Sequence, residues 1–384
     1  MPGKNSPHST PSLSLDQHYG HSQPRLAAWE NLLIYGDNLL ALRYLCTQER
    51  LCGKIRLVYI DPPFATNQDF VYRPGHAATV SRPRRGLLAY HDRLTGEEYL
   101  NFLRQRLQLL RELLAADGSI YVHIDCKIGH YVKVLMDEIF GAEHFINDIT
   151  RIKCNPKNFS RRAYGNIKDT ILFYSKTHQY VWNDPREPLS PGDIARMFPK
   201  VDRYGRRYTT TPLHAPGETA NGATGQTWRG RKPPPGRHWR YPPEELDRLD
   251  QLGRIEWSAS GNPRKIIYAD EVLAHGKKRQ DVWIFKDPAF PRYPTEKNLD
   301  LLKTIIEASS RPGDIVLDCF AGSGTTLVAA ELLGRRWIGI DASWKAITVI
   351  RQRLAELDNV PAYRFLRLDE TPLEQSIEEG ASAL

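Results

Sequence analysis

The sequence predicts an α/β fold in which a mostly parallel sheet is covered by helices on both faces. Short apolar runs alternate with amphipathic segments in two flanks, up to residue 180 and after residue 290, and such alternation is typical of parallel sheets with crossover helices. The stretch between the flanks is rich in Gly, Pro and Thr and has no clear period. The chain has 384 residues, enough for two domains at roughly 150 residues each. We therefore expect both flanks to form one sheet and the middle to be an insertion.

The first flank contains three predicted strands and one predicted helix. Residues 57–60 are an apolar run that ends at Asp61 and predicts a buried strand. Leucines at 100, 103, 107, 110 and 114 recur in steps of three and four, which predicts one face of a helix. Asp117 and Gly118 should end that helix. Residues 119–124 and 170–174 are apolar and rich in β-branched and aromatic side chains, so we predict strands there.

The second flank repeats the alternation more regularly. Residues 299–306, 325–333 and 343–357 have helical patterns, and the runs 315–317 and 337–340 between them predict strands. From these patterns we divide the chain into five parts. They are a flexible tail rich in Ser, Pro and His (1–25), the first half of the α/β domain (26–180), the insertion (181–290), the second half (291–360) and an acidic tail (361–384).

Composition excludes several classes of protein. No run of 18 apolar residues occurs, so we expect no membrane-spanning helix. The five cysteines are an odd number, and no two have CxxC spacing. This pattern fits a reduced cytoplasmic protein better than a disulfide framework or a zinc site, and we expect no metal.

The basic charge of the chain is concentrated in its middle. Of the formal charge of +8, residues 151–297 carry 28 Lys and Arg against 16 Asp and Glu, and they contain five of the eight tryptophans. Basic side chains among aromatic ones suit phosphates and stacked bases. The candidate contacts are Arg229, Arg231, Lys232, Arg237 and Arg240. The alternative is a solvated, loop-rich surface.

A glycine-rich turn joins a predicted strand to a predicted helix. Asp318 ends the strand, Gly322 and Gly324 form the turn, and Asp341 ends the next strand, at a distance that suits binding of ribose hydroxyls. A dinucleotide site would have a third glycine where Leu327 stands, and a P-loop would have a lysine after the second glycine. A carboxylate before the turn disfavours phosphates. S-adenosylmethionine, which combines a ribose with a sulfonium and an ammonium, fits these demands; a simple tight turn is the alternative.

The second motif, Asp61-Pro62-Pro63-Phe64, follows a buried strand. Its prolines fix the backbone and remove two N–H donors, which leaves carbonyl acceptors and one carboxylate beside an aromatic ring. Asp61 and the Pro62 carbonyl can accept both hydrogens of an exocyclic amine and so make its nitrogen nucleophilic, while Phe64 can stack on the base. The alternative is an ordinary proline turn at a strand end.

Together the two motifs resemble the amino-group DNA methyltransferases that use S-adenosylmethionine. The catalytic motif precedes the cofactor turn, with a target-recognition region between them, and this order resembles the permuted β class. Tyr293-Pro-Thr-Glu-Lys297 and Tyr35-Gly-Asp37-Asn38 resemble two further cofactor motifs of that family. The resemblance covers roughly residues 30–180 and 290–357 and implies a Rossmann-like methyltransferase fold with an inserted recognition region.

The resemblance implies three groups of site residues. Those that would hold and activate a flipped base are Asp61, Pro62, Pro63 and Phe64. Those that would contact the cofactor around the turn and at its ribose are Asp318, Phe320, Gly322, Gly324, Thr325 and Asp341. Those near its amino-acid end would be Asp37, Thr295 and Lys297. For Lys297 a surface charge at a helix start is the alternative, and for Asp341 a carboxylate that caps the next helix.

The resemblance also implies a site-specific enzyme whose partner is double-stranded DNA. Adenine N6 is favoured because an Asp opens the first motif, and cytosine N4 is the alternative. Family members often form dimers and accompany a restriction endonuclease, so a second copy and a nuclease are candidate partners, and action in the bacterial cytoplasm is expected. An RNA or protein amino-methylase, a nicotinamide dehydrogenase and a DNA-binding protein without activity are the competing classes.

Overall fold

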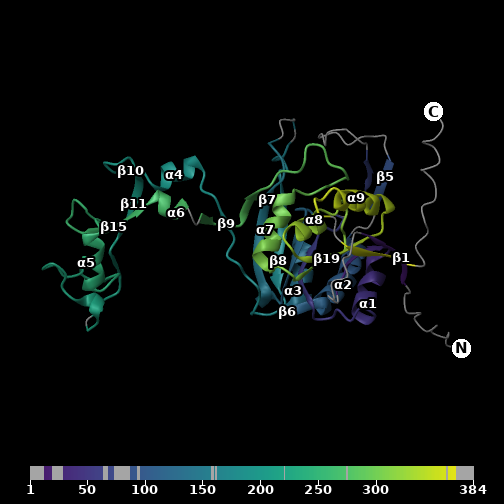
Figure 1. The fold of residues 1–384 in the computed structure, drawn as a ribbon, viewed down its shortest axis with the longest axis horizontal. Helices are drawn as coiled ribbons and strands as arrows, with labels where there is room; N and C mark the ends of the chain where they lie inside the picture. The colour runs from purple at the N-terminus through teal and green to yellow at the C-terminus, as the bar shows by residue number, and fades with distance from the viewer. Residues whose placement is uncertain are drawn as a thin grey trace. The chain divides into compact units, whose positions relative to one another are not determined.

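The computed structural model describes residues 13–19, 29–63, 68–72, 87–92, 96–156, 160, 162–219, 221–273, 276–359 and 362–368, with only the backbone for 13–19, 68–72 and 87–92. The chain divides into two compact units (Figure 1). The first combines the two flanks, up to Asp184 and from Gln280, and the second spans Pro185–Arg279.

One ten-stranded sheet forms the centre of the first unit in the described chain. Across the sheet its strands are β1 (Leu13–Tyr19), β20 (Tyr363–Leu368), β2 (Asn31–Tyr35), β19 (Arg336–Asp341), β18 (Ile315–Asp318), β3 (Ile55–Ile60), β6 (Leu114–Ile124), β8 (Lys168–Ser175), β7 (Phe145–Ile152) and β17 (Val282–Ile284). Neighbours from β20 to β6 run parallel, whereas β1–β20, β6–β8 and β8–β7 are antiparallel. Because β18 of the second flank lies beside β3 of the first, the prediction of one mostly parallel sheet is confirmed.

Helices cover both faces of this sheet (Figure 1). The helices on one face are α1 (Asn38–Thr47), α2 (Gly96–Leu113) and α3 (Gly129–Phe140), and those on the other are α7 (Leu299–Ser309), α8 (Thr325–Leu332) and α9 (Trp344–Ala355). Within β3, Val58 and Ile60 face the first layer, and Leu57 and Tyr59 face the second. Burial on both faces explains why this strand is apolar without alternation.

The leucine pattern of the first flank correctly predicts α2. Leu103, Leu107 and Leu110 are fully buried against the sheet, and each contributes roughly 1.5–3 kcal/mol of hydrophobic stabilisation. The predicted helix end at Asp117 and Gly118 is wrong, because α2 ends at Leu113 and β6 begins at the next residue. The pairing of β6 with β3 shifts there, and a Cβ on Gly118 would lie 2.9 Å from the Ile55 carbonyl oxygen. Gly118 therefore permits an irregularity in a strand.

The two predicted tails contain strands. Leu13–Tyr19 forms β1 and pairs antiparallel with β20, Tyr363–Leu368, so the tail predictions for 1–25 and 361–384 are wrong at these positions. The tails were predicted from composition, whereas strands at a sheet edge pair through their backbone groups, and this pairing depends little on composition. The first unit also contains a hairpin of β4 (Gln68–Tyr72) and β5 (Leu87–Asp92).

The second unit is built from short elements around a small core. Its strands are β9 (Arg186–Glu187), β10 (Lys200–Val201), β11 (Arg207–Pro212), β12 (His214–Pro216), β13 (Arg237–Trp239), β14 (Ile255–Trp257), β15 (Pro263–Tyr268) and β16 (Lys277–Lys278). Its helices are α4 (Pro191–Met197), α5 (Pro243–Gln251) and α6 (Ala269–Leu273). Strands β10, β11, β15 and β14 form a four-stranded sheet, and Leu213, Trp228, Trp239, Leu246 and Leu249 form a buried cluster. Nowhere in the described part of the chain is a helix both long and apolar enough to cross a membrane.

Candidate active site

A cavity of about 390 Å³ lies in the first unit, where β2, β3, β18 and β19 end. Carboxyl ends of parallel strands meet at one edge of a sheet, and such edges commonly hold ligands. The predicted site residues that line the cavity are Asp37, Asp61, Pro63, Thr295, Lys297, Asp318, Phe320, Gly322, Thr325 and Asp341. Pro62 and Gly324 are neighbours of lining residues, and Phe64 lies outside the described residues. The structure thus brings together segments from both flanks.

Asp61 and Lys297 form an ion pair inside the cavity. Lys297 Nζ lies 2.5 Å from Asp61 Oδ2, and it also donates to the Thr295 carbonyl oxygen at 3.2 Å. Thr295 has a positive φ of 62°. The alternative of a surface charge at Lys297 is wrong, because this residue is only 8% exposed. The other carboxylate oxygen of Asp61, Oδ1, is buried and has no hydrogen-bond partner among the described residues, so it can accept from a ligand.

The glycine-rich turn is held by Asp341. The Gly322 N–H donates to Asp341 Oδ2 at 2.7 Å, and the Ser343 N–H donates to Asp341 Oδ1 at 2.8 Å. The carboxylate therefore does cap the chain before α9, and its side chain also borders the cavity. Burial raises the pKa of Asp341 to about 6. Gly324 has a φ of 74°, and a Cβ there would lie 2.7 Å from Ile350 Cγ1, so both the backbone angle and the packing require glycine.

Asp318 brings a buried carboxyl group to the cavity floor. Its Oδ1 accepts the Phe320 N–H at 3.0 Å, and its Oδ2 accepts the Thr326 hydroxyl at 2.5 Å. Burial, and then the charges of Asp61 and Asp341, raise the pKa of Asp318 to about 7, although both hydrogen bonds oppose this shift. A bound cation would relieve the cost of the ionised form.

The start of α1 and helix α2 form contacts at the cavity that the sequence did not reveal. Asn38 donates from Nδ2 to the Cys319 carbonyl oxygen at 2.8 Å and accepts from Arg106 Nε at 2.5 Å. Arg106 also pairs with Asp37 at 3.2 Å. Asp37 caps α1 by accepting two backbone N–H groups of the first turn. The cavity wall therefore depends on a long-range contact between α1, α2 and the glycine-rich turn.

Two aromatic rings border the same wall. The Arg106 guanidinium lies 3.5 Å from the centroid of the Phe102 ring, and the Phe102 and Phe320 rings are 6.1 Å apart. Both phenylalanines line the cavity. Phe102 belongs to α2, where its spacing relative to the leucines gave no hint of a role at the site.

Arg353 of α9 joins the segment before α7 to the glycine-rich turn. It pairs with Glu296 at 3.2 Å, and its Nη1 donates to the Ser323 carbonyl oxygen and to the Thr325 hydroxyl, each at 2.9 Å. The segment before α7 is thereby tied to the turn before α8.

The donors and acceptors of the cavity fit S-adenosylmethionine. Asp318 and the free Oδ1 of Asp61 offer negative charge to its cationic groups, Asp341 has lone pairs for ribose hydroxyls, and the rings of Phe102 and Phe320 suit an adenine. A pyrophosphate would instead meet carboxylates on the cavity floor, since Lys297 and Arg106 already pair with Asp61 and Asp37.

The predicted DNA contacts all lie in the second unit, and all five side chains are exposed. Arg229 pairs with Asp250 at 2.6 Å and with Asp247 at 3.8 Å, so much of its charge is neutralised. Arg231 and Arg240 donate to backbone carbonyl oxygens of Gly261 and Pro212. The other two are Arg237, whose Nη1 lies 3.2 Å from His214 Nδ1, and Lys232.

Comparisons with known proteins point to one family. A family model described as a DNA methylase of the N6/N4 class matches residues 55–352. The type II methyltransferase M.EcaI of Enterobacter cloacae is 45% identical over 331 residues, which cover 85% of this chain and 69% of that protein. The StyLTI Mod subunit, a type III restriction-modification enzyme of Salmonella typhimurium, is 30% identical over 79% of this chain, which spans half of that subunit.

Solved structures give weaker likenesses. The cytosine-N4-specific PvuII DNA methyltransferase has a TM-score of 0.49 and 15% identity, with 86% of this chain and 87% of that chain covered. The complex of M1.HpyAVI with S-adenosylmethionine has a TM-score of 0.44 and 17% identity, with 84% and 99% covered. On the strength of the family match and of the 45% identity to a named methyltransferase, the chain belongs to the N6/N4 family of DNA methyltransferases, which use S-adenosylmethionine as methyl donor.

Proposed function

We propose that this methyltransferase modifies the exocyclic amine of a base flipped out of duplex DNA, with adenine N6 as the preferred target. The observation that carries the proposal is the free Oδ1 of Asp61, a buried acceptor at the edge of a cavity that suits the cofactor. Extrusion of the base costs a few kcal/mol, which contacts elsewhere on the DNA offset. The preference for adenine rests on the resemblance, in which Asp at the first motif position is more typical of adenine enzymes.

In this proposal the Asp61 motif prepares the amine. Asp61 and the Pro62 carbonyl accept its two hydrogens, Pro63 keeps the turn rigid, and Phe64 stacks on the base. S-adenosylmethionine would supply a methyl group on a sulfonium, with the neutral thioether S-adenosylhomocysteine as the leaving group. The amine nitrogen forms a bond to the methyl carbon, the carbon–sulfur electrons remain on sulfur, and one amine proton passes to Asp61. Positioning supplies most of the acceleration.

The remaining cavity residues hold the cofactor in this proposal. Asp341 accepts from the ribose hydroxyls, while Gly322, Gly324 and Thr325 shape the turn beside it. Phe320 and Asp318 line the pocket. The amino-acid end of the cofactor is held by Asp37, Thr295 and Lys297.

The second unit, Pro185–Arg279, is proposed to recognise the DNA sequence. Its exposed basic side chains suit phosphates, which fix the register of a protein on duplex DNA. Restriction-modification relatives support a companion nuclease and cytoplasmic action as further proposals, and dimer formation is a third. Light scattering of the purified protein tests the dimer.

Methylation of duplex DNA followed by digestion to nucleosides tests the proposed target. DNA incubated with enzyme and S-adenosylmethionine is digested, and the products are identified by mass spectrometry. We expect N6-methyldeoxyadenosine. N4-methyldeoxycytidine would overturn the choice of base, and methylation of RNA in preference to DNA would overturn the choice of substrate.

A further inference from the structure

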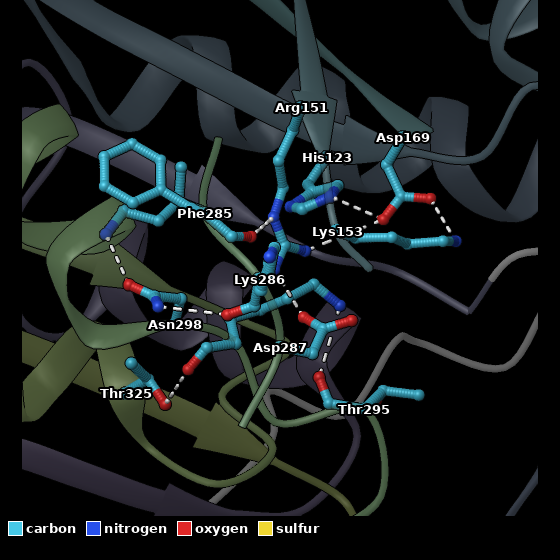
Figure 2. A network of polar contacts seen from close by, with 12 residues as sticks. His123, Arg151, Lys153, Asp169, Phe285, Lys286, Asp287, Thr295, Asn298 and Thr325 are labelled. Atoms are coloured by element: carbon cyan, nitrogen blue, oxygen red, sulfur yellow. Dashed lines mark hydrogen bonds and ion pairs between the residues drawn. The ribbon is translucent and has the colours of Figure 1, made fainter. Parts of the chain in front are cut away.

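Three buried side chains form a line of hydrogen bonds that ends at the cavity. The Tyr59 hydroxyl lies 2.8 Å from His123 Nδ1, and His123 Nε2 lies 3.2 Å from Asp169 Oδ2. The three residues are at most 2% exposed, and they come from β3, β6 and β8. Tyr59 lines the cavity. Figure 2 shows His123 facing Asp169, with Lys153 on the opposite side of that carboxylate.

The charges around Asp169 fix the direction of these hydrogen bonds. Lys153 Nζ donates to Asp169 Oδ1 at 2.5 Å, and Arg151 Nη1 lies 3.7 Å from Oδ2 (Figure 2). Burial would raise the pKa of Asp169, but its hydrogen bond with His123 and the charge of Lys153 lower it well below the usual range. Asp169 is therefore an anion that only accepts hydrogen bonds.

An acceptor at Asp169 determines where the histidine proton lies. Burial lowers the pKa of His123, so the ring is neutral and carries one N–H. That N–H is on Nε2, where it donates to Asp169, and Nδ1 must accept from the Tyr59 hydroxyl. The Tyr59 hydroxyl has one proton and uses it to donate a hydrogen bond to His123 Nδ1. Toward the cavity, Tyr59 Oη can act only as an acceptor.

The strand register places Tyr59 near the two key carboxylates, Asp61 and Asp318. Leu317 of β18 pairs with Val58 of β3, so Asp318 and Tyr59 are the next residues along these neighbouring strands. Asp61 follows Tyr59 by two positions and therefore leaves the sheet on the same side. The Tyr59 side chain is also more deeply buried than that of Asp61. Tyr59 therefore lies next to both carboxylates, and its hydroxyl points toward β6, the neighbour of β3 on the side away from β18.

We propose that Tyr59 Oη accepts a hydrogen bond from the cationic end of the bound cofactor, and that His123 and Asp169 are positioning residues that keep it an acceptor. The inference rests on the proposed function and adds a cofactor contact to it. The donors at that end are the ammonium N–H groups and the polarised C–H groups of the sulfonium methyl. An acceptor polarised by a chain ending in a carboxylate favours such a cation.

We expect the substitution Asp169→Asn to reverse the direction of both hydrogen bonds in this line. Lys153 requires an oxygen at the position of Oδ1, so the new amide would turn its NH₂ toward His123 Nε2. That nitrogen would then accept, the proton would move to Nδ1, and Nδ1–H would donate to Tyr59. The tyrosine hydroxyl would be left to point its own proton at a cation. Asp169→Asn should therefore weaken cofactor binding through Tyr59.

Calorimetric titration with S-adenosylmethionine and with S-adenosylhomocysteine tests the proposal in four variants. We expect Tyr59→Phe and Asp169→Asn each to weaken S-adenosylmethionine binding by about tenfold, the usual size for a hydrogen bond to a charged group. The double variant should bind as weakly as Tyr59→Phe alone, because Asp169 acts through the hydroxyl. Tyr121→Phe is the matched control, since its hydroxyl is equally buried but bonds to Ser309 at 2.7 Å. It should bind normally.

The two ligands locate the donor. An equal loss for both places the contact at the ammonium, and a loss for S-adenosylmethionine alone places it at the sulfonium methyl. Normal S-adenosylmethionine binding by Tyr59→Phe, or additive losses in the double variant, would overturn the proposal while leaving the role of Asp61 intact. Failure of the wild type to bind the cofactor would instead overturn the proposed function.

Nitrogen-15 NMR of the protein with labelled histidine shows which ring nitrogen of His123 carries the proton. This measurement needs neither ligand nor activity. The wild-type His123 ring should carry its proton on Nε2, and Asp169→Asn should move it to Nδ1. A wild-type proton on Nδ1 would contradict the proposal even if the Asp169 variant failed to fold.

Discussion

Lys297 Nζ and Asp61 Oδ2 lie 2.5 Å apart, although they come from opposite flanks of the chain. The pair connects the motif before α7 to the end of β3, and so joins the segment that we propose to lie near the cofactor to the segment that we propose to lie near the base. Its side chains are about one-tenth exposed. Loss of one partner would leave a largely buried charge without its counter-ion.

Lys297→Met should therefore lower the free energy of unfolding by about 3 kcal/mol. Urea denaturation without cofactor measures this change. The double variant with Asp61→Asn should be less destabilised than Lys297→Met alone, because no uncompensated charge remains. Simple addition of the two single effects would show that the pair contributes no coupling energy.

Cofactor affinity should increase as pH rises from 6 to 8. Burial raises the pKa of Asp318 to about 7, so the group is largely protonated at pH 6, and a bound cation favours its ionised form. Cofactor binding below pH 7 then releases the proton of Asp318, so the affinity increases as the ionised fraction of Asp318 increases. Calorimetry at several pH values should show an increase that Asp318→Asn reduces. A residual slope in this variant belongs to Asp341, whose pKa burial raises to about 6. An unchanged slope would contradict the assignment to Asp318.

The same carboxyl group should reduce stability at neutral pH. Its folded pKa of about 7 exceeds the unfolded value of about 3.9, so the protein without cofactor loses stability as pH rises through this range. Asp318→Asn keeps an acceptor for the Phe320 N–H and should raise the melting temperature at pH 8 more than at pH 5. A larger gain in melting temperature at pH 5 than at pH 8 would contradict the raised pKa of Asp318.

Gly324→Ala should damage the cofactor turn through strain and packing together. Gly324 has a φ of 74° and an added Cβ would meet Ile350, whereas Gly313 has a φ of 85° and no atom within 4 Å of that position. Gly313→Ala measures the backbone strain alone, about 1 kcal/mol. Gly324→Ala should cost a further 1–3 kcal/mol or so and weaken cofactor binding. Equal melting temperatures for the two variants would contradict the packing argument.

Among the exposed basic residues, Lys232 and Arg229 should behave differently. Lys232→Ala should weaken DNA binding and reduce the slope of log affinity against log salt by about 1. Arg229 pairs with Asp250 and Asp247, so its replacement by Ala should mainly destabilise the second unit. Fluorescence anisotropy over a range of salt concentrations, with thermal melting, separates the effects. A salt slope unaffected by Lys232→Ala would exclude it as a phosphate contact.

Local patterns predicted most of the fold and the parts of the site that lie in one segment. The strand, turn and helix around Asp318 and the leucine face of α2 were predicted because each pattern occupies consecutive residues. Strand β1 and the continuation of β6 across Gly118 were missed, since both depend on pairing with a distant strand.

Contacts between distant segments account for the parts of the site that remained hidden. His123 and Asp169 look like ordinary polar residues in strand patterns, and only the sheet order brings them to Tyr59. Arg106 interrupts an apolar helix face, which is a weak local signal, but its partner Asn38 is far away in the sequence. Nothing in the sequence around Lys297 indicated that Asp61 is its partner.

Methyl transfer to duplex DNA by Asp61→Asn tests the central claim most directly. Asp125→Asn is the control, because Asp125 follows the adjacent strand β6 and bonds to the Lys127 N–H. With isotopically labelled S-adenosylmethionine, we expect the Asp61 variant to bind the cofactor but to lose at least about 100-fold in rate, the scale for one preorganised contact in a reaction centre. The control should methylate as the wild type does. Wild-type rates in the Asp61 variant would contradict the role of this carboxylate.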